Sequence, residues 1–412
     1  MPRRLMLCAL FAGTACLAQP LPPAPAATAG DGPQGPQPPD ANQQPPTDSP
    51  AYPAIRNVPA TTGRANLPST PLPFTVTRIG AFTQPTALAM LPDGRALVTE
   101  RPGALKLRAA DGAVATIAGV PAVAPGGQGG LLNVAPAPDF ATSGTIYLSF
   151  AERRPNGGSS LALMRATLAG EALSGQRVIW RAGSDGPGTQ FGGAIAFAPD
   201  GRSLFLSVGE RQRFSPAQDP AQALGKIIRL TLDGAAWPGN PDAKAGGIRA
   251  MTWTSGHRNP YGLVFTPDGR LWEGEMGPKG GDELNLLVAG GNYGWPIVSN
   301  GDNYSGVPIP DHPSRPDLAA PALWWNPSIS PGGMAYYSGT LFPQFRGSLL
   351  IAALSAQGLV RVALEGAKAT PAAQWDMGMR VRDVKQARDG AIWLLQDDWR
   401  GSGGGLYRLT PK

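Results

Sequence analysis

The chain has 412 residues, of which 16% are charged, and its formal net charge is +6. The basic residues are scattered and form no run interleaved with aromatic residues, which argues against a nucleic-acid-binding protein. The low charge and the 55 glycines suit a loop-rich sheet protein outside the cytoplasm.

Residues 1–18 are predicted to be an export signal. A basic start is followed by an apolar core at 5–12 that is too short to span a bilayer, and then by small residues. Cleavage after Ala18 would give a periplasmic protein, whereas cleavage before Cys16 would give a lipoprotein, and both outcomes stay open. Cys8 and Cys16 are the only cysteines, so the folded part is expected to contain no disulfide. No later segment predicts a membrane span.

Residues 19–66 are predicted to be a mobile linker. They are rich in proline, alanine, glutamine and glycine and almost lack large apolar side chains. Such a segment cannot offset its ordering entropy by burial. The folded domain is therefore expected at 67–412, with its first strands from about residue 71.

A short pattern recurs along that domain: an apolar run, Pro-Asp-Gly, and a second apolar run. Asp-Gly supplies the positive-φ turn of a tight hairpin, and the proline presets the approach to it. Three close copies, one looser copy and two copies with altered turns predict six hairpins. They lie at 87–98, 194–206 and 262–272, at 384–394, and at 134–149 and 334–351.

The spacing of these hairpins favours one architecture. From Asp93 to Asp389 the pattern returns about every 59 residues, enough for four short strands and their loops. A single four-stranded sheet cannot bury both of its faces, and radial stacking of several sheets solves this problem. We predict an all-β fold, a six-bladed β-propeller with four-stranded antiparallel blades. An array of β-sandwiches is the alternative.

Polar residues crowd into loops between 253 and 304. The string Gly-His-Arg-Asn-Pro-Tyr-Gly at 256–262 is followed by Glu-Gly-Glu-Met-Gly-Pro at 273–278 and Gly-Gly-Asp-Glu-Leu-Asn at 280–285. Such loops are typical of binding sites, and loop carbonyls beside carboxylates suit Ca²⁺. The alternative is a solvated loop between blades.

These strings resemble the soluble quinoprotein aldose sugar dehydrogenases of the glucose/sorbosone dehydrogenase family. The resemblance runs from about residue 74 to 409. It implies a six-bladed propeller that binds pyrroloquinoline quinone (PQQ) and Ca²⁺ on one face. The blocks that carry it are 129–132, 224–229, 256–262, 281–285 with 292–296, and 380–384.

The resemblance also assigns roles to residues. Arg258, Arg380 and Arg382 match the family's quinone-binding arginines, and guanidinium groups suit carboxylates. Asn259 matches an amide that contacts the cofactor.

Two calcium sites are implied in the same way. The carbonyl groups of Gly277 and Pro278 match ligands of a catalytic Ca²⁺, which would polarise the quinone. Glu283 and the carbonyl group of Tyr293 match a second, structural site.

The chain departs from the family pattern at three positions. Gln190 stands where the family has its catalytic histidine base, and an amide has no useful basicity near neutral pH. Met276 stands where His or Gln is usual, and a thioether suits a hard cation poorly. Ser355 stands where a lysine is expected, which removes one cation from the quinone pocket.

One compensation is a hypothesis. Glu210 stands where the family has an aspartate that orients the histidine, and it is one methylene longer, so it would reach toward the substrate. The alternative is an ordinary interaction with Arg211 or Arg213. The only histidines, His257 and His312, do not align with the base; we predict a structural role for His257 and assign none to His312.

The leading hypothesis is a periplasmic enzyme that transfers hydride from C1 of an aldose to PQQ, forms a lactone, and passes electrons to an external acceptor. A homodimer is compatible with it. The main alternative is a catalytically degenerate propeller that binds a sugar, a cell-wall fragment or a protein. A Ca²⁺-dependent lactonase would need carboxylates converging on the channel, beyond Glu275, Asp282 and Glu283.

Overall fold

The computed structural model describes residues 63–155, 157–184, 186, 188–398 and 403–412. The predicted export signal and nearly all of the predicted linker lie outside the described residues. The described chain is almost entirely strand and loop, with two helical turns, α1 (Phe140–Ser143) and α2 (Gly247–Met251), and three 3₁₀ turns, Ser215–Gln218, His312–Ser314 and Pro343–Phe345.

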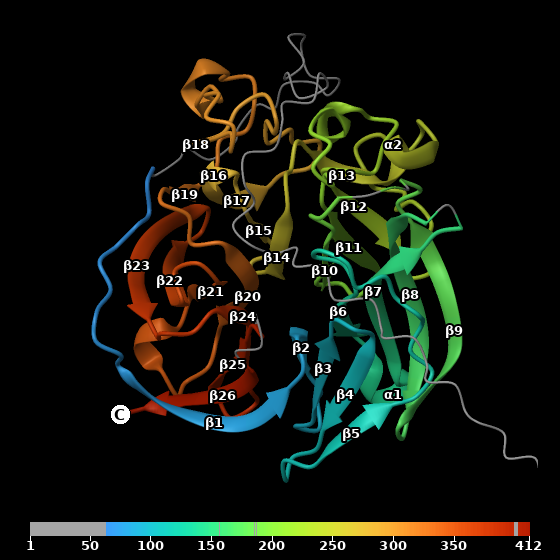
Figure 1. Ribbon diagram of the computed structural model, residues 1–412, viewed down its shortest axis with the longest axis vertical. Helices are drawn as coiled ribbons and strands as arrows, with labels where there is room; N and C mark the ends of the chain where they lie inside the picture. The colour runs from blue at the N-terminus through green and yellow to red at the C-terminus, as the bar shows by residue number, and fades with distance from the viewer. Residues whose placement is uncertain (1–62, 156, 185, 187, 399–402) are drawn as a thin grey trace, which may run out of the picture. The chain divides into compact units, whose positions relative to one another are not determined.

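Six four-stranded antiparallel sheets form the blades of a β-propeller (Figure 1). Blade 1 is β2 (Pro85–Met90), β3 (Ala96–Glu100), β4 (Ala104–Arg108) and β5 (Val114–Ile117). Blade 2 is β6 (Leu131–Pro136), β7 (Thr145–Arg153), β8 (Ser159–Ala169) and β9 (Ala172–Arg181). Blade 3 is β10 (Gly192–Phe197), β11 (Ser203–Val208), β12 (Lys226–Thr231) and β13 (Thr252–Ser255).

The second half of the chain completes the ring. Blade 4 is β14 (Pro260–Phe265), β15 (Leu271–Glu275), β17 (Asp282–Leu287) and β19 (Leu323–Trp325), with a two-stranded ribbon of β16 (Lys279–Gly280) and β18 (Gly301–Asp302) beside it. Blade 5 is β20 (Pro331–Tyr337), β21 (Ser348–Ala353), β22 (Gly358–Glu365) and β23 (Lys368–Asp376). Blade 6 is β24 (Val381–Gln386), β25 (Ile392–Gln396), β26 (Gly404–Pro411) and β1 (Phe74–Phe82).

The six predicted hairpins are confirmed as the first two strands of the six blades. Their turn chemistry is as expected: Asp93 accepts a hydrogen bond from the backbone N–H of Arg95 at 3.1 Å, and Gly94 has φ +88°. Asp200 accepts the equivalent bond from Arg202 at 3.0 Å. The local sequence therefore determines where each blade begins.

Blade 6 closes the ring by joining the two ends of the domain. β1 pairs antiparallel with β26, so that Phe74 lies opposite Pro411 and Phe82 opposite Gly404. This pairing could not be predicted from the sequence, because the partners are more than 300 residues apart and no turn connects them.

The apolar core lies between neighbouring blades. One buried cluster joins blades 1 and 2, with Leu97 and Leu148 among its members, and further clusters join each following pair. Leu88 of blade 1 packs with Trp393 of blade 6 in the cluster that completes the circle. Because each blade buries both faces against its neighbours, the apolar core is complete only in the closed ring.

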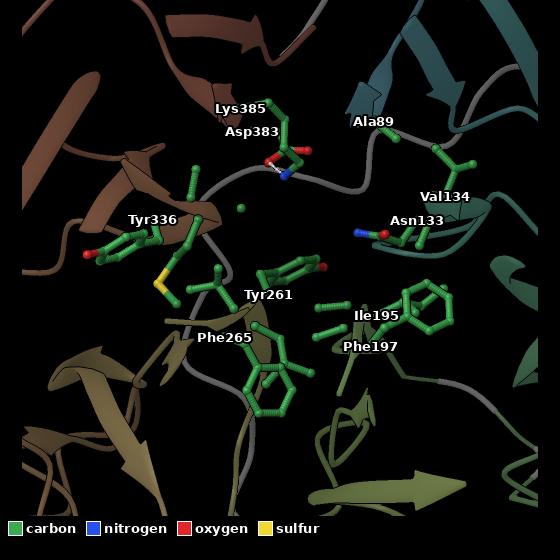
Figure 2. A pocket seen from close by; sticks show the side chains of 18 of the residues that line it. Ala89, Asn133, Val134, Ile195, Phe197, Tyr261, Phe265, Tyr336, Asp383 and Lys385 are labelled. Carbon is green, nitrogen blue, oxygen red and sulfur yellow. Dashed lines mark hydrogen bonds and ion pairs between the residues drawn. The ribbon is translucent and has the colours of Figure 1, made fainter. Parts of the chain in front are cut away.

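The first strands of the blades line a central channel that contains a cavity of about 670 Å³ (Figure 2). Apolar side chains such as Val134, Ile195 and Phe265 make up most of its wall. Arg101, Arg382 and other polar side chains reach one end. Among the described residues, no helix has the length and apolarity that a bilayer crossing requires.

Removing the Phe74 side chain tests the closure. Phe74 is 1% exposed and meets Trp375 edge to face at 5.4 Å between ring centroids. Phe74→Ala should lower the free energy of unfolding by about 3–5 kcal/mol, measured by urea denaturation. The neighbouring Thr75 is exposed, so Thr75→Ala is the matched control. Equal effects of the two substitutions would contradict the role of β1.

Candidate functional site

The loops that carry the predicted site residues meet at one end of the channel. Gln128, just before β6, accepts three hydrogen bonds at its side-chain oxygen: from the backbone N–H of Gln190 at 3.1 Å, the amide of Asn259 at 3.1 Å and the hydroxyl of Tyr261 at 3.0 Å. Gln190 precedes β10 and Asn259 precedes β14, so the starts of three first strands lie together. The loops after β11 and β15 reach the same end, because each pairs antiparallel with the preceding strand.

Gln128 is a site residue that the sequence analysis missed. It directly precedes the Gly-Gly-Leu-Leu block at 129–132 that contributed to the resemblance. A single amide in a glycine-rich loop carries no signal of its own, and only the contacts with three loops reveal its position.

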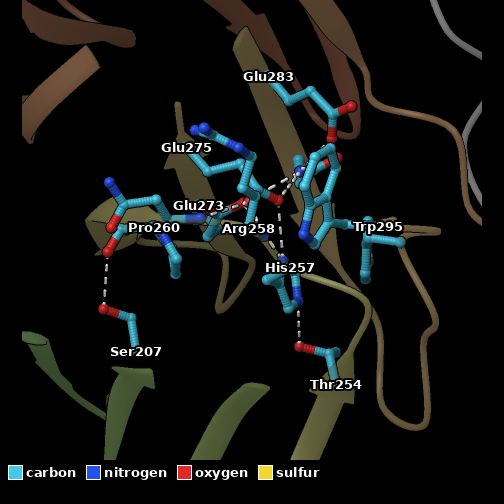
Figure 3. Close-up of polar contacts among 12 residues, drawn as sticks. Ser207, Thr254, His257, Arg258, Pro260, Glu273, Glu275, Glu283 and Trp295 are labelled. Carbon is cyan, nitrogen blue, oxygen red and sulfur yellow. Dashed lines mark hydrogen bonds and ion pairs between the residues drawn. The ribbon is translucent and has the colours of Figure 1, made fainter. Parts of the chain in front are cut away.

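Arg258 is held rigidly between backbone carbonyls and aromatic rings. Its Nη1 donates to the carbonyl groups of Met276 at 3.0 Å and Gly277 at 2.7 Å. Its guanidinium carbon lies 5.3 Å from the ring centre of Trp295 (Figure 3). It lies 5.9 Å from the ring centre of Tyr304. Such cation–π contacts favour a fixed, desolvated guanidinium group.

Gln190 occupies a constrained position between a carboxylate and a guanidinium group. It is 3% exposed, and its backbone φ is +55°. With its amide oriented to satisfy both neighbours, the nitrogen donates to Oε1 of Glu210 and the oxygen accepts from Nη2 of Arg258 at 2.8 Å. Gln190 thus orients Arg258 and has no lone pair of useful basicity.

The placement of Glu210 argues against a reach toward the substrate. The residue is 0% exposed. Its Oε2 accepts hydrogen bonds from the backbone N–H groups of Arg213 and Phe214, each at 2.6 Å. Its Oε1 accepts one from the backbone N–H group of Gln212 at 3.0 Å. Burial raises the pKa of this carboxyl group, while Arg258 opposes the rise. Glu210 therefore anchors its own loop and Gln190, and its contact with Arg213 is to the backbone N–H of that residue.

Arg380 and Arg382 share one buried carboxylate. Nε of Arg380 lies 3.0 Å from Oδ2 of Asp397, and Nη2 of Arg382 lies 2.9 Å from Oδ1. Arg382 also lies over the ring of Tyr261, at 5.8 Å, and Tyr261 bonds Gln128. The structure thus brings all three predicted arginines to the same end of the channel.

A buried acidic cluster lies behind Arg258 on blade 4. Glu273 and Glu275 on β15 face Asn285 and Glu283 on β17 in register. The amide nitrogen of Asn285 donates to Glu273 at 3.0 Å and to Glu283 at 3.1 Å. Burial, and then the like charge of Glu275, raise the pKa of Glu273 well above its usual value.

Both histidines of the chain bond this cluster. His257 bridges Thr254 at 2.8 Å and Glu275 at 3.0 Å (Figure 3), and His312 contacts Glu283 at 3.2 Å. Tyr293 stacks on His257, with 5.0 Å between ring centroids. His257 is structurally bound, as expected, and His312 has a buried partner that the sequence analysis did not foresee.

The loop after β15 is clamped from one side. The Asp282 carboxylate accepts hydrogen bonds from the backbone N–H groups of Gly277 at 2.9 Å and Ser330 at 2.7 Å. Burial raises the pKa of Asp282 to about 6. Pro278 is buried next to Gly277. Ser355 lies beside this loop system and donates to the carbonyl group of Ser328 at 2.8 Å.

This end of the channel fits a flat, multiply anionic molecule such as PQQ. Several guanidinium groups converge there, and burial leaves Nε of Arg258 and Oδ1 of Asn259 without a hydrogen-bond partner. Buried polar atoms without partners are costly and usually mark a contact that a ligand or water completes. Arg258, Asn259, Arg380 and Arg382 would hold such a group.

The fit to calcium is divided between two places. The carbonyl oxygen of Gly277 already accepts a bond from Arg258, and the Met276 sulfur lies 3.9 Å from the amide of Asn259, where a harder donor is usual. The carboxylates of Glu273 and Glu275 and a ring nitrogen of His257 lie close enough together to hold one ion, and Oε1 of Glu273 has no partner. The donor chemistry therefore suits the acidic cluster better than the loop after β15.

Comparisons with known proteins agree with the fold. The model of the glucose/sorbosone dehydrogenase family matches residues 82–408, so the chain belongs to that family. It is 38% identical to the aldose sugar dehydrogenase of Escherichia coli (strain K12) over 341 residues, which cover 80% of this chain and 90% of that protein.

Solved structures give the same result. A crystal structure of a glucose dehydrogenase superposes with a TM-score of 0.78 at 42% identity, covering 82% of this chain and all of that chain. The PQQ-bound form of an aldose sugar dehydrogenase from Streptomyces coelicolor superposes with a TM-score of 0.68 at 30% identity, covering 82% and 98%.

Lys226 predicts a measurable pH dependence of stability. Its fully buried ammonium group donates to the carbonyl groups of Pro216, Ala217 and Leu224 at 2.8–2.9 Å, and burial lowers its pKa from 10.5 to about 7. Between these pH values the unfolded chain binds a proton that the folded chain does not, so stability rises with pH. The rise is at most about 1.4 kcal/mol per pH unit.

Lys226→Met should remove this rise. The difference in free energy of unfolding between the original protein and the variant should grow from pH 7.5 to 9.5, measured by urea denaturation. Lys368 is exposed, so Lys368→Met is the control and should leave the pH dependence unchanged. A pH-independent difference for Lys226→Met would show that the lysine titrates normally.

Proposed function

We propose that this protein is a PQQ- and calcium-dependent oxidoreductase that oxidises the C1 hydroxyl group of an aldose to a lactone and passes the electrons to an external acceptor. The observation that carries the proposal is the convergence of Arg258, Arg380 and Arg382 at the channel end, in a chain of the glucose/sorbosone dehydrogenase family. The predicted export signal supports a periplasmic location, with or without a lipid at Cys16. A homodimer is compatible with the proposal.

The arginines provide the binding energy for the anionic cofactor. Guanidinium forks bond carboxylates in a planar geometry, and their partial burial strengthens each bond. The amide of Asn259 sits between the Arg258 loop and Gln128, which fixes its direction. PQQ, when bound, would supply the hydride-accepting quinone that no side chain can provide.

We include in the proposal the two calcium sites that the family resemblance implies. At the first site the carbonyl groups of Gly277 and Pro278 would hold the ion, and the bond from Arg258 to the Gly277 carbonyl group would have to open. Glu283 and the carbonyl group of Tyr293 would hold a second ion, and the carboxyl groups of Glu273 and Glu275 lie on the neighbouring strand.

The proposed reaction lacks an evident base for the proton of the sugar hydroxyl group. Oxidation of an anomeric hydroxyl requires that its proton leaves as hydride departs, and a positioned base typically contributes about 10²–10⁴-fold to such a step. Gln190 cannot accept that proton, and Glu210 is enclosed by backbone N–H groups. We therefore expect turnover well below that of an enzyme with a histidine at this position.

Cofactor binding and turnover are tested together. Purified protein is mixed with PQQ and Ca²⁺, the absorption spectrum of the quinone is recorded, and dye reduction is followed with several aldoses. The proposal predicts a shifted spectrum and slow, aldose-dependent reduction. Arg258→Ala should weaken PQQ binding by about tenfold or more, because a buried charged hydrogen-bond donor is lost. The absence of PQQ binding by the unaltered protein would overturn the proposal.

Gln190→His tests the missing base directly. The imidazole would be positioned by Glu210, so dye reduction should rise by about tenfold to a hundredfold, with a pH profile that climbs through the ionisation of the new histidine. Gln190→Asn is the matched control and should give no gain. An unchanged rate with bound PQQ would show that the proton is not what limits turnover.

The second candidate function is a propeller that binds a ligand and has lost catalysis. The observation that favours it is the locked geometry of Gln190, whose amide is fully used by Glu210 and Arg258. PQQ binding without any aldose-dependent reduction would favour this candidate.

A further inference from the structure

Asp397 lies at the point where the positive charges of the channel end converge. It follows β25 and is 1% exposed. Its carboxylate contacts Arg380 and Arg382 of its own blade, as described above, and Nη2 of Arg101 lies 3.9 Å from its Oδ1. Its backbone N–H also donates to the carbonyl group of Arg380 at 2.9 Å.

These contacts join two blades. Arg101 follows β3 of blade 1, whereas Arg380 and Arg382 stand at the start of β24 in blade 6. A further bond, from Nη1 of Arg101 to the carbonyl group of Gly127 at 3.4 Å, links the group to the loop of Gln128. Asp397 therefore fixes side chains from different sheets relative to one another.

The carboxylate is ionised in this environment. Burial alone would raise the pKa of Asp397, but Arg382 and Arg380 hold it below its usual value. Asp397 then faces three guanidinium groups, and the further carboxylate near Arg382, that of Asp383, is paired with Lys385 at 2.7 Å, which leaves a local excess of positive charge. Arg101 and Arg382 also line the channel cavity, so this excess is presented to the cavity.

We propose that Asp397 is a positioning residue that holds Arg101, Arg380 and Arg382 as one anion-binding cluster, and that Arg101 is a further anion-binding residue of the site. The ligand chemistry is a rigid molecule with several carboxylates. Its identification as PQQ rests on the proposed function, whereas the arrangement of the cluster does not.

Two physical effects of removing the carboxylate have opposite signs. Replacement by a neutral amide increases the net positive charge, and charge alone would tighten the binding of an anion. Loss of the shared carboxylate frees the guanidinium groups, and each must then be ordered when the ligand binds, which weakens binding. The sign of the change therefore separates a positioning role from a purely electrostatic one.

The experiment compares Asp397→Asn with Asp389→Asn. Asp389 pairs with Arg408 at 2.7 Å in the exposed turn of the same blade, so its substitution removes one salt bridge outside the site. Binding of PQQ and of citrate, a simple tricarboxylate probe, is measured by fluorescence and calorimetric titration. Asp397→Asn should weaken the binding of both probes by about tenfold, and Asp389→Asn should change neither.

The outcomes are distinct. Equal or tighter binding by Asp397→Asn overturns the proposal. If the unaltered protein binds citrate but not PQQ, and Asp397→Asn weakens citrate binding, the proposed function fails while the positioning role stands. If the unaltered protein binds neither probe, both fail.

A second variant covers loss of folding. If Asp397→Asn does not fold, Arg101→Gln is measured in its place. Arg101 lies at the edge of the cluster, where its side chain is 16% exposed and that of Asp397 is 1% exposed, so its substitution should disturb the fold less. It should weaken binding of both probes by about threefold to tenfold with an unchanged circular dichroism spectrum. Unchanged binding would overturn the assignment of Arg101.

Discussion

Closure of the ring by β1 and β26 is the constraint on which the site depends. Each blade buries its faces against two neighbours, so none of the six can adopt its packed position alone. Only the closed ring sets the starts of the first strands at fixed distances around the channel. The side chains at the starts of these strands are therefore brought together by the closed ring, and no local sequence pattern indicates that they are neighbours.

At the channel end, each buried charged side chain faces groups that stabilise its charge. Asp397 faces several guanidinium groups, and Glu210 faces backbone N–H groups and Gln190. Arg258 is separated from the acidic cluster of blade 4 by its own backbone, whose N–H bonds Glu275 at 2.5 Å. Positive charge is therefore in excess toward the channel, and negative charge is in excess behind it, within the blade.

The sequence predicted those features that depend on local chemistry. Each hairpin could be placed because Asp-Gly turns, as at Asp93 and Gly94, encode their geometry within a few residues. The arginines could be placed because they stand in strings that resemble a family. Pairing of β1 with β26 could not be predicted, because it depends on ring closure rather than on a turn.

The remaining gaps concern the direction of side chains. Gln128, Arg101 and Asp397 carry no recognisable pattern, and their roles follow only from contacts between loops of different blades. One hypothesis let Glu210 reach toward the substrate because its side chain is longer, but the backbone N–H groups of the following turn bind its carboxylate and hold it inward. A one-methylene difference in the sequence cannot reveal which donors surround a carboxylate.

The most direct test of the account is a crystal structure of the protein grown with PQQ. The quinone is expected at the channel end, with its carboxylates bonded to Arg258, Arg380 and Arg382 and its ring beside Asn259. Electron density for PQQ elsewhere on the molecule, with these arginines unchanged and unbound, would contradict it.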